Sequence, residues 1–99
     1  MRISFPGQDS EYILNKIKDK IANRKIGQMI SFQLTHSDLK ITIKKMGVSY
    51  FSFRHETHEG NLIWHLKNEK VAFSHRPFKK EVFEKLADIV EDLGGSVQK

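Results

Sequence analysis

Cysteine is absent from this chain of 99 residues, which excludes disulfides, cysteine-based zinc sites and a thiol nucleophile. Long apolar runs are absent as well, so we expect neither a secretory signal peptide after Met1 nor insertion into a membrane. The chain has no internal repeat, no low-complexity segment and no glycine-rich loop of the kind that holds phosphates. These absences favour a cytoplasmic protein without a bound cofactor.

The composition is that of a basic globular chain. Hydrophobic residues make up 38% and charged residues 29%, which is typical of a folded protein rather than a disordered tail. A chain of this length builds one hydrophobic core, so we expect residues 1–99 to form a single domain. The net charge is +5 and the pI is about 9.6, and such a balance favours polyanionic partners such as nucleic acid or anionic lipid.

A β-hairpin near the middle of the chain gives the clearest pattern. Apolar and polar residues alternate through residues 39–54, as they do in strands with one buried and one solvated face. Ile41 and Phe51 share the buried face only if the loop between the strands has an odd number of residues. Lys45-Met46-Gly47 supplies three residues, with glycine where a type I turn plus bulge needs a left-handed residue.

The neighbouring segments follow the same alternation. Leu34 is expected beside Leu39 across a turn at His36-Ser37 or over 35–38, and a third hairpin turns at Glu59-Gly60 or one residue later. The predicted elements are a short N-terminal edge strand over 2–5, a helix over about 11–24, strands over about 29–35, 38–45, 48–57, 61–67 and 70–74, and a helix over about 78–93.

Both predicted helices have one apolar stripe, and the predicted sheet has one apolar face. The simplest burial packs both helices on that face and leaves the other face open. The predicted fold is therefore α+β: a helix, a five-stranded antiparallel meander and a second helix. Asp9 or Ser10 is expected to cap the first helix and Gly94-Gly95 to end the second, with the last four residues frayed.

The open face of the sheet is the leading candidate for a functional site. Its lysines and arginine can neutralise phosphates, and its tyrosine and histidine can stack on bases. We expect no acidic residue in the middle of this face. The predicted nucleic-acid-binding residues are Lys40, Lys44, Tyr50, Arg54, His65 and Lys67, and the face is completed by Ser31, Gln33, Thr42, Ser52 and Ile63.

Other interpretations stay open. An ordinary solvated sheet face has the same composition, and binders of single strands usually have several aromatic residues rather than one. A module for protein interaction or inhibition, or a homodimer formed through the sheet face, is the second function class. The order of elements, with Lys79 and Lys80 opening the last helix, is similar to that of double-stranded-RNA-binding domains; that family has three strands and a Gly-Pro loop missing here, so we assign no family.

An enzyme or metal protein centred on the histidines is the third function class, in which His65 and Arg54, with Lys67 nearby, act on a phosphodiester. In the segment 55–59, His55 and His58 point to opposite faces of a strand. They therefore lack the helical spacing that aligns two histidines on one metal ion. We expect His55 to face the core beside Trp64 as a hydrogen-bonded histidine. Nothing positions a nucleophile, an oxyanion hole or a pair of carboxylates, so no catalytic residue is assigned.

Overall fold

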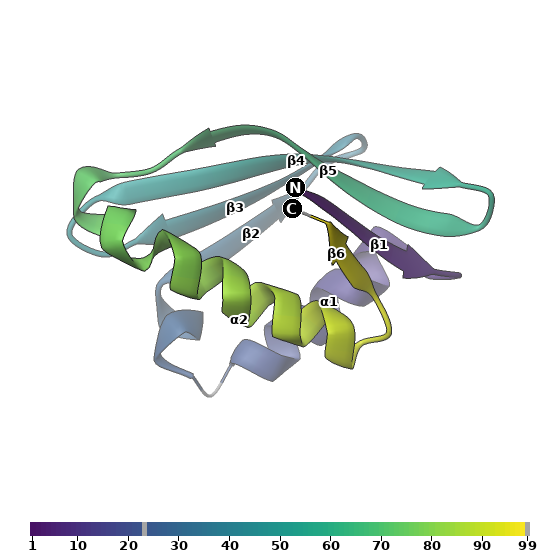
Figure 1. The fold of residues 1–99 in the computed structure, drawn as a ribbon, viewed down its shortest axis with the longest axis horizontal. Helices are drawn as coiled ribbons and strands as arrows, with labels where there is room; N and C mark the ends of the chain where they lie inside the picture. The colour runs from purple at the N-terminus through teal and green to yellow at the C-terminus, as the bar shows by residue number, and fades with distance from the viewer. Residues whose placement is uncertain (23, 99) are drawn as a thin grey trace.

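In the described part of the chain, two α-helices lie against a six-stranded antiparallel sheet with the strand order β2-β3-β4-β5-β1-β6 (Figure 1). The computed structural model describes residues 1–22 and 24–98, without the side chains of residues 25, 26 and 78. The elements are β1 (Arg2–Pro6), α1 (Ser10–Ile21), the 3₁₀ helix η1 (Lys25–Gln28), β2 (Ile30–Leu34), β3 (Asp38–Lys44), β4 (Val48–His58), β5 (Asn61–Lys70), the 3₁₀ helix η2 (Phe73–Phe78), α2 (Lys79–Asp92) and β6 (Ser96–Gln98). The fold class is α+β, but the sheet has six strands rather than the predicted five.

The meander from β2 to β5 has the registers that the alternation predicts, as far as the pair of Phe53 and Leu66. Leu34 pairs with Leu39, Ile41 with Phe51, and His55 with Trp64. The third hairpin turns at Glu59-Gly60, since His58 pairs with Asn61. These pairs are local in sequence, so the side-chain period and the turn length determine them together.

The β3–β4 turn has the predicted three residues but a different conformation. Met46, rather than glycine, occupies the left-handed region at φ 53°, and Gly47 lies at φ 145°. The Lys45 N–H donates to the carbonyl of Gly47 at 3.0 Å, which closes the turn. A φ of 145° is rare for residues with a side chain, so glycine is needed here for a reason other than the predicted one.

The predicted strand over 70–74 is wrong, because β5 continues to Lys70 and the chain then enters η2. The register shifts between Ser52, which pairs with Asn68, and Phe53, which pairs with Leu66. Lys67 is the extra residue of a β-bulge, and β5 continues along β4 as far as Lys70 instead of turning back. The chain then enters η2, so residues 71–74 belong to no strand.

The two ends of the chain form the strands of the sheet beyond β5. β1 lies between β5 and β6, so the predicted edge strand is an interior one. β6 forms where a frayed tail was expected. The Gly95 N–H donates to the carbonyl of Val90 and the Gly94 N–H to that of Glu91, which is the Schellman arrangement with Gly94 at φ 88°. This reversal at the end of α2 brings residues 96–98 alongside β1.

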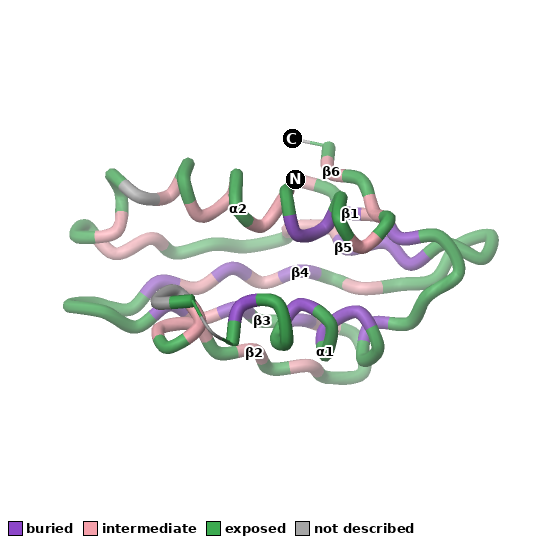
Figure 2. Tube along the Cα trace, turned by 90° about the horizontal axis from the view of Figure 1, so that it is seen from below, coloured by how far each residue is buried: buried purple, intermediate pink, exposed green. Residues whose placement is uncertain are grey.

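Both helices cover the same face of the sheet, as predicted (Figure 1). Asp9 caps α1 by accepting a hydrogen bond from the Tyr12 N–H at 2.8 Å. The helix ends at Ile21, earlier than expected, and residue 23 of the expected span lies outside the described residues. Figure 2 shows buried residues alternating with intermediate ones along β4 and with exposed ones along α1. The core consists of Ile3, Phe5, Ile13, Leu14, Ile17, Ile21, Leu39, Ile41, Ile43, Phe51, Phe53, Leu62, Trp64, Ile89 and Val90.

Two serine–histidine pairs satisfy the polar groups at the border of the core. His55 Nε2 lies 2.8 Å from the carbonyl of Thr35, so this nitrogen carries the proton and Nδ1 accepts from the hydroxyl of Ser10. Ser10 Oγ in turn accepts the indole N–H of Trp64 at 3.1 Å. His55 is thus the hydrogen-bonded histidine that was predicted beside Trp64.

The second pair repeats this arrangement in η2. His75 Nε2 donates to the carbonyl of Lys45 at 2.6 Å, and His75 Nδ1 accepts from the buried hydroxyl of Ser49. Ser49 Oγ also accepts the N–H of Ala72 at 2.8 Å. These bonds tie η2 to the β3–β4 hairpin.

No described helix has the length and apolar character needed to cross a membrane.

Candidate functional site

The face of the sheet opposite the helices carries most of the polar residues of β3, β4 and β5. Cross-strand partners share a face, so the registers assign its members. One row runs from Asp38 through Arg54 and His65 to Arg2. A second row runs from Thr42 through Tyr50 to Lys70. The six predicted binding residues, Lys40, Lys44, Tyr50, Arg54, His65 and Lys67, therefore all lie on this one face, which we call the open face.

Lys67 lies on the open face, which it shares with His65 through the regular alternation of β5. The bulge then puts Asn68, the partner of Ser52, on the same face, although neighbours in a regular strand point to opposite faces. The register shift leaves Lys67 without a partner in β4, and its ammonium lies 2.8 Å from the carboxylate of Asp38 on the open face.

At one end of the open face a lysine lies on the tyrosine. The ammonium of Lys40 is 4.7 Å from the centre of the Tyr50 ring, which is a cation–π contact. Lys70 is the cross-strand partner of Tyr50, and Lys44 lies next to this group along β3. This end therefore presents positive charge, with the aromatic ring partly covered by an ammonium group.

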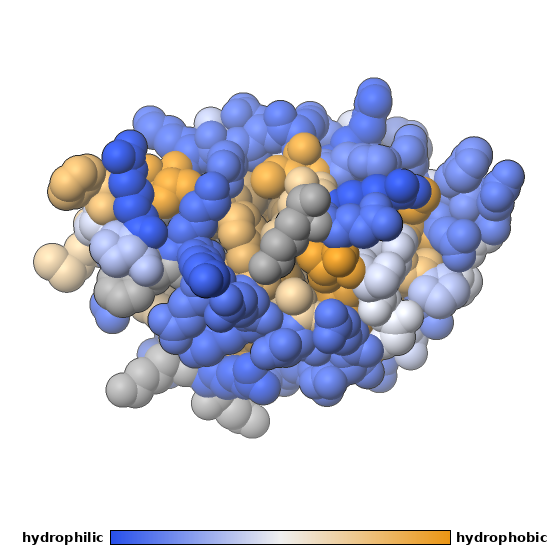
Figure 3. All heavy atoms as spheres, viewed as in Figure 1, coloured by the Kyte–Doolittle hydropathy of each residue, from blue (hydrophilic) through white to orange (hydrophobic). Residues whose placement is uncertain are grey.

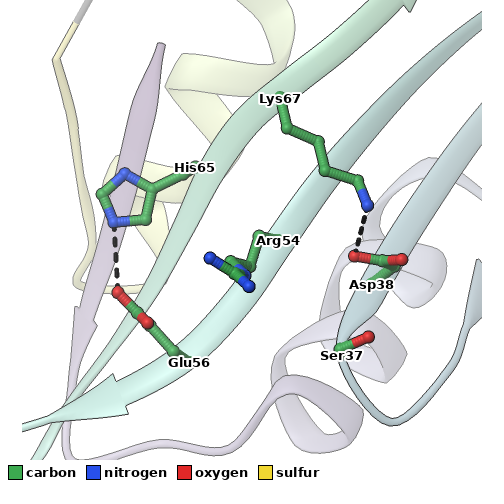
Figure 4. Close-up of a pocket in the computed structure, with 6 residues that line it drawn as sticks. All are labelled: Ser37, Asp38, Arg54, Glu56, His65 and Lys67. Atoms are coloured by element: carbon green, nitrogen blue, oxygen red, sulfur yellow. Dashed lines mark ion pairs between the residues drawn. The ribbon is translucent and has the colours of Figure 1, made fainter.

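At the other end a shallow pocket of about 440 Å³ is lined by charged side chains (Figure 4). His65 Nε2 lies 3.4 Å from the carboxylate of Glu56, and Lys67 pairs with Asp38. Figure 4 shows the guanidinium of Arg54 between these two ion pairs. Within the described part of the chain, Arg54 makes no ion pair of its own.

The two carboxylates correct the expectation of a face without acids in its middle. Asp38 is the cross-strand partner of Arg54, and Glu56 lies on the same face two residues further along β4. The side chains of the pairs Lys67–Asp38 and His65–Glu56 are between about a third and a half exposed. Ion pairs with this exposure contribute only about 0–1 kcal/mol, so an incoming anion competes with them at little cost.

Ile63 is a member of the open face that is not available to a ligand. It pairs with Ser4 on one side and Glu56 on the other, yet it is only 5% exposed. The neighbouring side chains cover it, so the open face has no flat apolar patch at this position.

Two cations of the open face were missed from the sequence. Arg2 joins the face because β1 pairs with β5, and Lys70 joins it because β5 continues past the bulge. Arg2 alternates with the buried Ile3, so its outward orientation was readable once the neighbour of β1 was known. The position of Lys70 depends on the bulge, for which the local pattern has no signal.

The residues of the open face do not form a metal site in the described part of the chain, where no three histidine, aspartate or glutamate side chains converge. His55 faces the core, and His58 lies near Glu59 at the exposed hairpin end. Comparison with family models, with curated proteins and with solved structures found no match.

Proposed function

We propose that the protein is a nucleic-acid-binding module that holds phosphates on its open face. The observation that supports this proposal is the uncovered row of cations on one side of the sheet: Arg2, Lys40, Lys44, Arg54, Lys67 and Lys70. Among the described residues, Asp38 and Glu56 are the two carboxylates on this face, and of the six cations Lys67 alone is found in an ion pair. An extended cationic surface of this kind releases counterions from a polyanion when it binds.

The aromatic content of the face favours contact with phosphates over stacking on bases. Tyr50 is the one tyrosine among its described members, and Lys40 already lies on the ring. Stacking platforms for single strands use several exposed aromatic rings. We therefore expect binding to duplexes with little dependence on sequence, since phosphates carry no sequence information.

The experiment measures binding of a duplex by fluorescence anisotropy. A duplex of about 16 base pairs, at roughly 3.4 Å per pair, exceeds the 40 Å long axis of the protein. If the five cations without ion pairs contact phosphates, the plot of log K against log salt has a slope of about −4 to −5. DNA and RNA duplexes are compared in parallel, because the shape of the groove differs between them.

Two triple variants separate the open face from the rest of the surface. Lys40→Glu, Lys44→Glu and Arg54→Glu together reverse three charges on the face, and we expect them to abolish binding. Lys16→Glu, Lys18→Glu and Lys20→Glu make the same change on exposed positions of α1. If both triples lose binding equally, or if the wild-type chain binds no duplex at low salt, the open face is not the site.

A homodimer through the open face is the competing proposal. Apposing two copies of this face brings like charges together, which opposes association at low salt. We therefore expect the free protein to be a monomer by light scattering at low salt. A dimer that the open-face triple variant abolishes would favour the competing proposal.

A further inference from the structure

A second recess lies on the helix side of the sheet, away from the open face. Its volume is about 330 Å³, near the lower end of the range of about 300–1,000 Å³ that is usual for small-molecule sites. The β3–β4 hairpin, η2 and the first turns of α2 surround it. In Figure 3 hydrophobic side chains lie at the surface at this end of the molecule, beside hydrophilic ones. We call this recess the groove.

Apolar side chains form much of the wall of the groove. Ile43 and Phe51 from the sheet line it together with Met29, Val71 and Val82 from the surrounding segments. These side chains come from five different elements and connections, so the recess is enclosed by the fold rather than by one helix. Methionine and aliphatic side chains adapt to apolar ligands of varied shape.

The polar groups within the groove are already satisfied. Ser49 and His75 both line it, but they bond to each other and to backbone atoms of Ala72 and Lys45. Among the described residues no buried side-chain donor or acceptor lacks a partner. The interior therefore offers an alkyl chain an apolar contact surface with no unsatisfied polar atom to cover.

Three lysines also line the groove and give it a positive balance. Lys79 pairs with Glu69 at 2.8 Å, and Lys85 pairs at 3.2 Å with Glu81, the one acid among the described lining residues. Lys45 is exposed and has no ion-pair partner among the described residues. An anionic group at the groove would therefore meet cations of which one is free.

Apolar residues at the surface extend the groove outward. Met46 lines it and is 91% exposed, and Phe73, next to the lining residue Ser74, is 84% exposed. The Ser74 hydroxyl donates to the carbonyl of Met46 at 2.9 Å, so the two segments are held together. Exposed apolar side chains beside an apolar recess are characteristic of a binding site.

We propose that the groove binds an amphipathic anion, namely an alkyl carboxylate of medium chain length. The alkyl chain lies against Ile43, Phe51 and Val82, and the carboxylate lies toward Lys45 and its neighbouring lysines. The site is separate from the open face and does not depend on nucleic-acid binding.

The test titrates sodium decanoate into ¹⁵N-labelled protein and follows the amide signals by NMR. Saturable shifts are expected near Met29, Phe51 and Val82, with the open face unaffected. Octanoate, which is shorter by two methylenes, is expected to bind about fifteenfold more weakly, at about fourfold per buried methylene. Decylammonium, with the opposite charge, is expected to bind about tenfold more weakly than decanoate.

Two neighbouring lysines provide a matched pair of variants. Lys45 lines the groove, whereas Lys44 lies on the open face. Lys45→Glu is expected to weaken decanoate about tenfold, and Lys44→Glu less than twofold. Val82→Trp fills the groove and is expected to abolish binding while thermal unfolding shows an intact fold; Val71→Trp does the same from another wall if the first variant does not fold.

Several results would overturn the proposal. It fails if decanoate gives no saturable shifts, or if decylammonium binds as tightly as decanoate. It also fails if Lys44→Glu and Lys45→Glu weaken binding equally. A molecular mass that rises with concentration, together with absent decanoate binding, would mean that a second copy covers the groove instead.

Discussion

Replacing Ser10 with alanine tests whether the buried hydrogen-bond relay holds α1 to the sheet. The hydroxyl accepts the indole N–H of Trp64 and donates to His55 Nδ1. Trp64 is 0% exposed, so its N–H would lose its acceptor where water cannot replace it. An unsatisfied buried donor costs about 1–3 kcal/mol, and the lost bond to the part-buried His55 adds about 0.5–1.5 kcal/mol. We expect Ser10→Ala to lower the free energy of unfolding by about 2–4 kcal/mol.

The cap of α1 is not involved, since Asp9 supplies it. At about 4–8 °C per kcal/mol for a chain of this size, a loss of about 2–4 kcal/mol should lower the melting temperature by roughly 8–32 °C. Urea and thermal unfolding followed by circular dichroism measure both quantities. Ser31→Ala, at an exposed position on β2, is the matched control and should change the stability by less than about 0.5 kcal/mol.

A double-mutant cycle tests whether the loss of the acceptor for the Trp64 indole N–H causes this destabilisation. Trp64→Phe removes the donor, so Ser10→Ala should cost less in that background by about 1–2 kcal/mol. The reasoning is refuted if Ser10→Ala costs no more than the Ser31 control, or if its cost is the same in both backgrounds.

Three further predictions concern packing and the ends of the chain. Ile63→Ala should lower the free energy of unfolding by about 2–4 kcal/mol, because Ile63 is covered on the open face. Val48→Ala, at a position that is 52% exposed, should lower it by less than about 0.5 kcal/mol. Equal losses in chemical denaturation would contradict the burial of Ile63. Gly95→Ala places a Cβ 2.6 Å from the Phe5 ring and 2.8 Å from the carbonyl oxygen of Ser4, so it should destabilise by about 1–3 kcal/mol. Gly60→Ala, where the Cβ meets open space, should cost about 1 kcal/mol, and a larger cost for Gly60→Ala than for Gly95→Ala would contradict the close packing at Gly95. A chain ending at Gly95 lacks β6, so hydrogen exchange should accelerate in β1 while β3 is unchanged; unchanged exchange in β1 would show that β6 does not protect it.

The meander could be predicted because its determinants are local. The alternation in β3 and β4 and the three-residue turn between them leave one register in which Ile41 meets Phe51. The bulge at Lys67 is different, because it depends on how β5 fits along β4 and leaves no trace in the alternation. It placed Asn68 and Lys70 on the open face, where regular alternation would have put Glu69.

The pairing of the two ends of the chain could not be predicted from local pattern. β1 and β6 are more than 90 residues apart at Ser4 and Ser96, and their meeting depends on the path of α2 and the reversal after it. The acids of the open face are another matter. Asp38 has the parity of Lys40, and Glu56 has that of Arg54, so both were readable from the sequence as members of the same face. Their ion pairs with Lys67 and His65 depend on three-dimensional neighbours and required the structure.

The most direct test of the open face is an NMR titration of the wild-type chain with a short duplex at low salt. The account predicts that amide signals of Lys40, Lys44, Arg54 and Lys67 shift or broaden together, and that raising the salt reverses the change. Signals of α1 and α2 should stay in place, because both helices lie on the other side of the sheet. Shifts confined to α1, with its exposed lysines, or no shifts at all, would contradict the assignment of the open face as the nucleic-acid-binding surface.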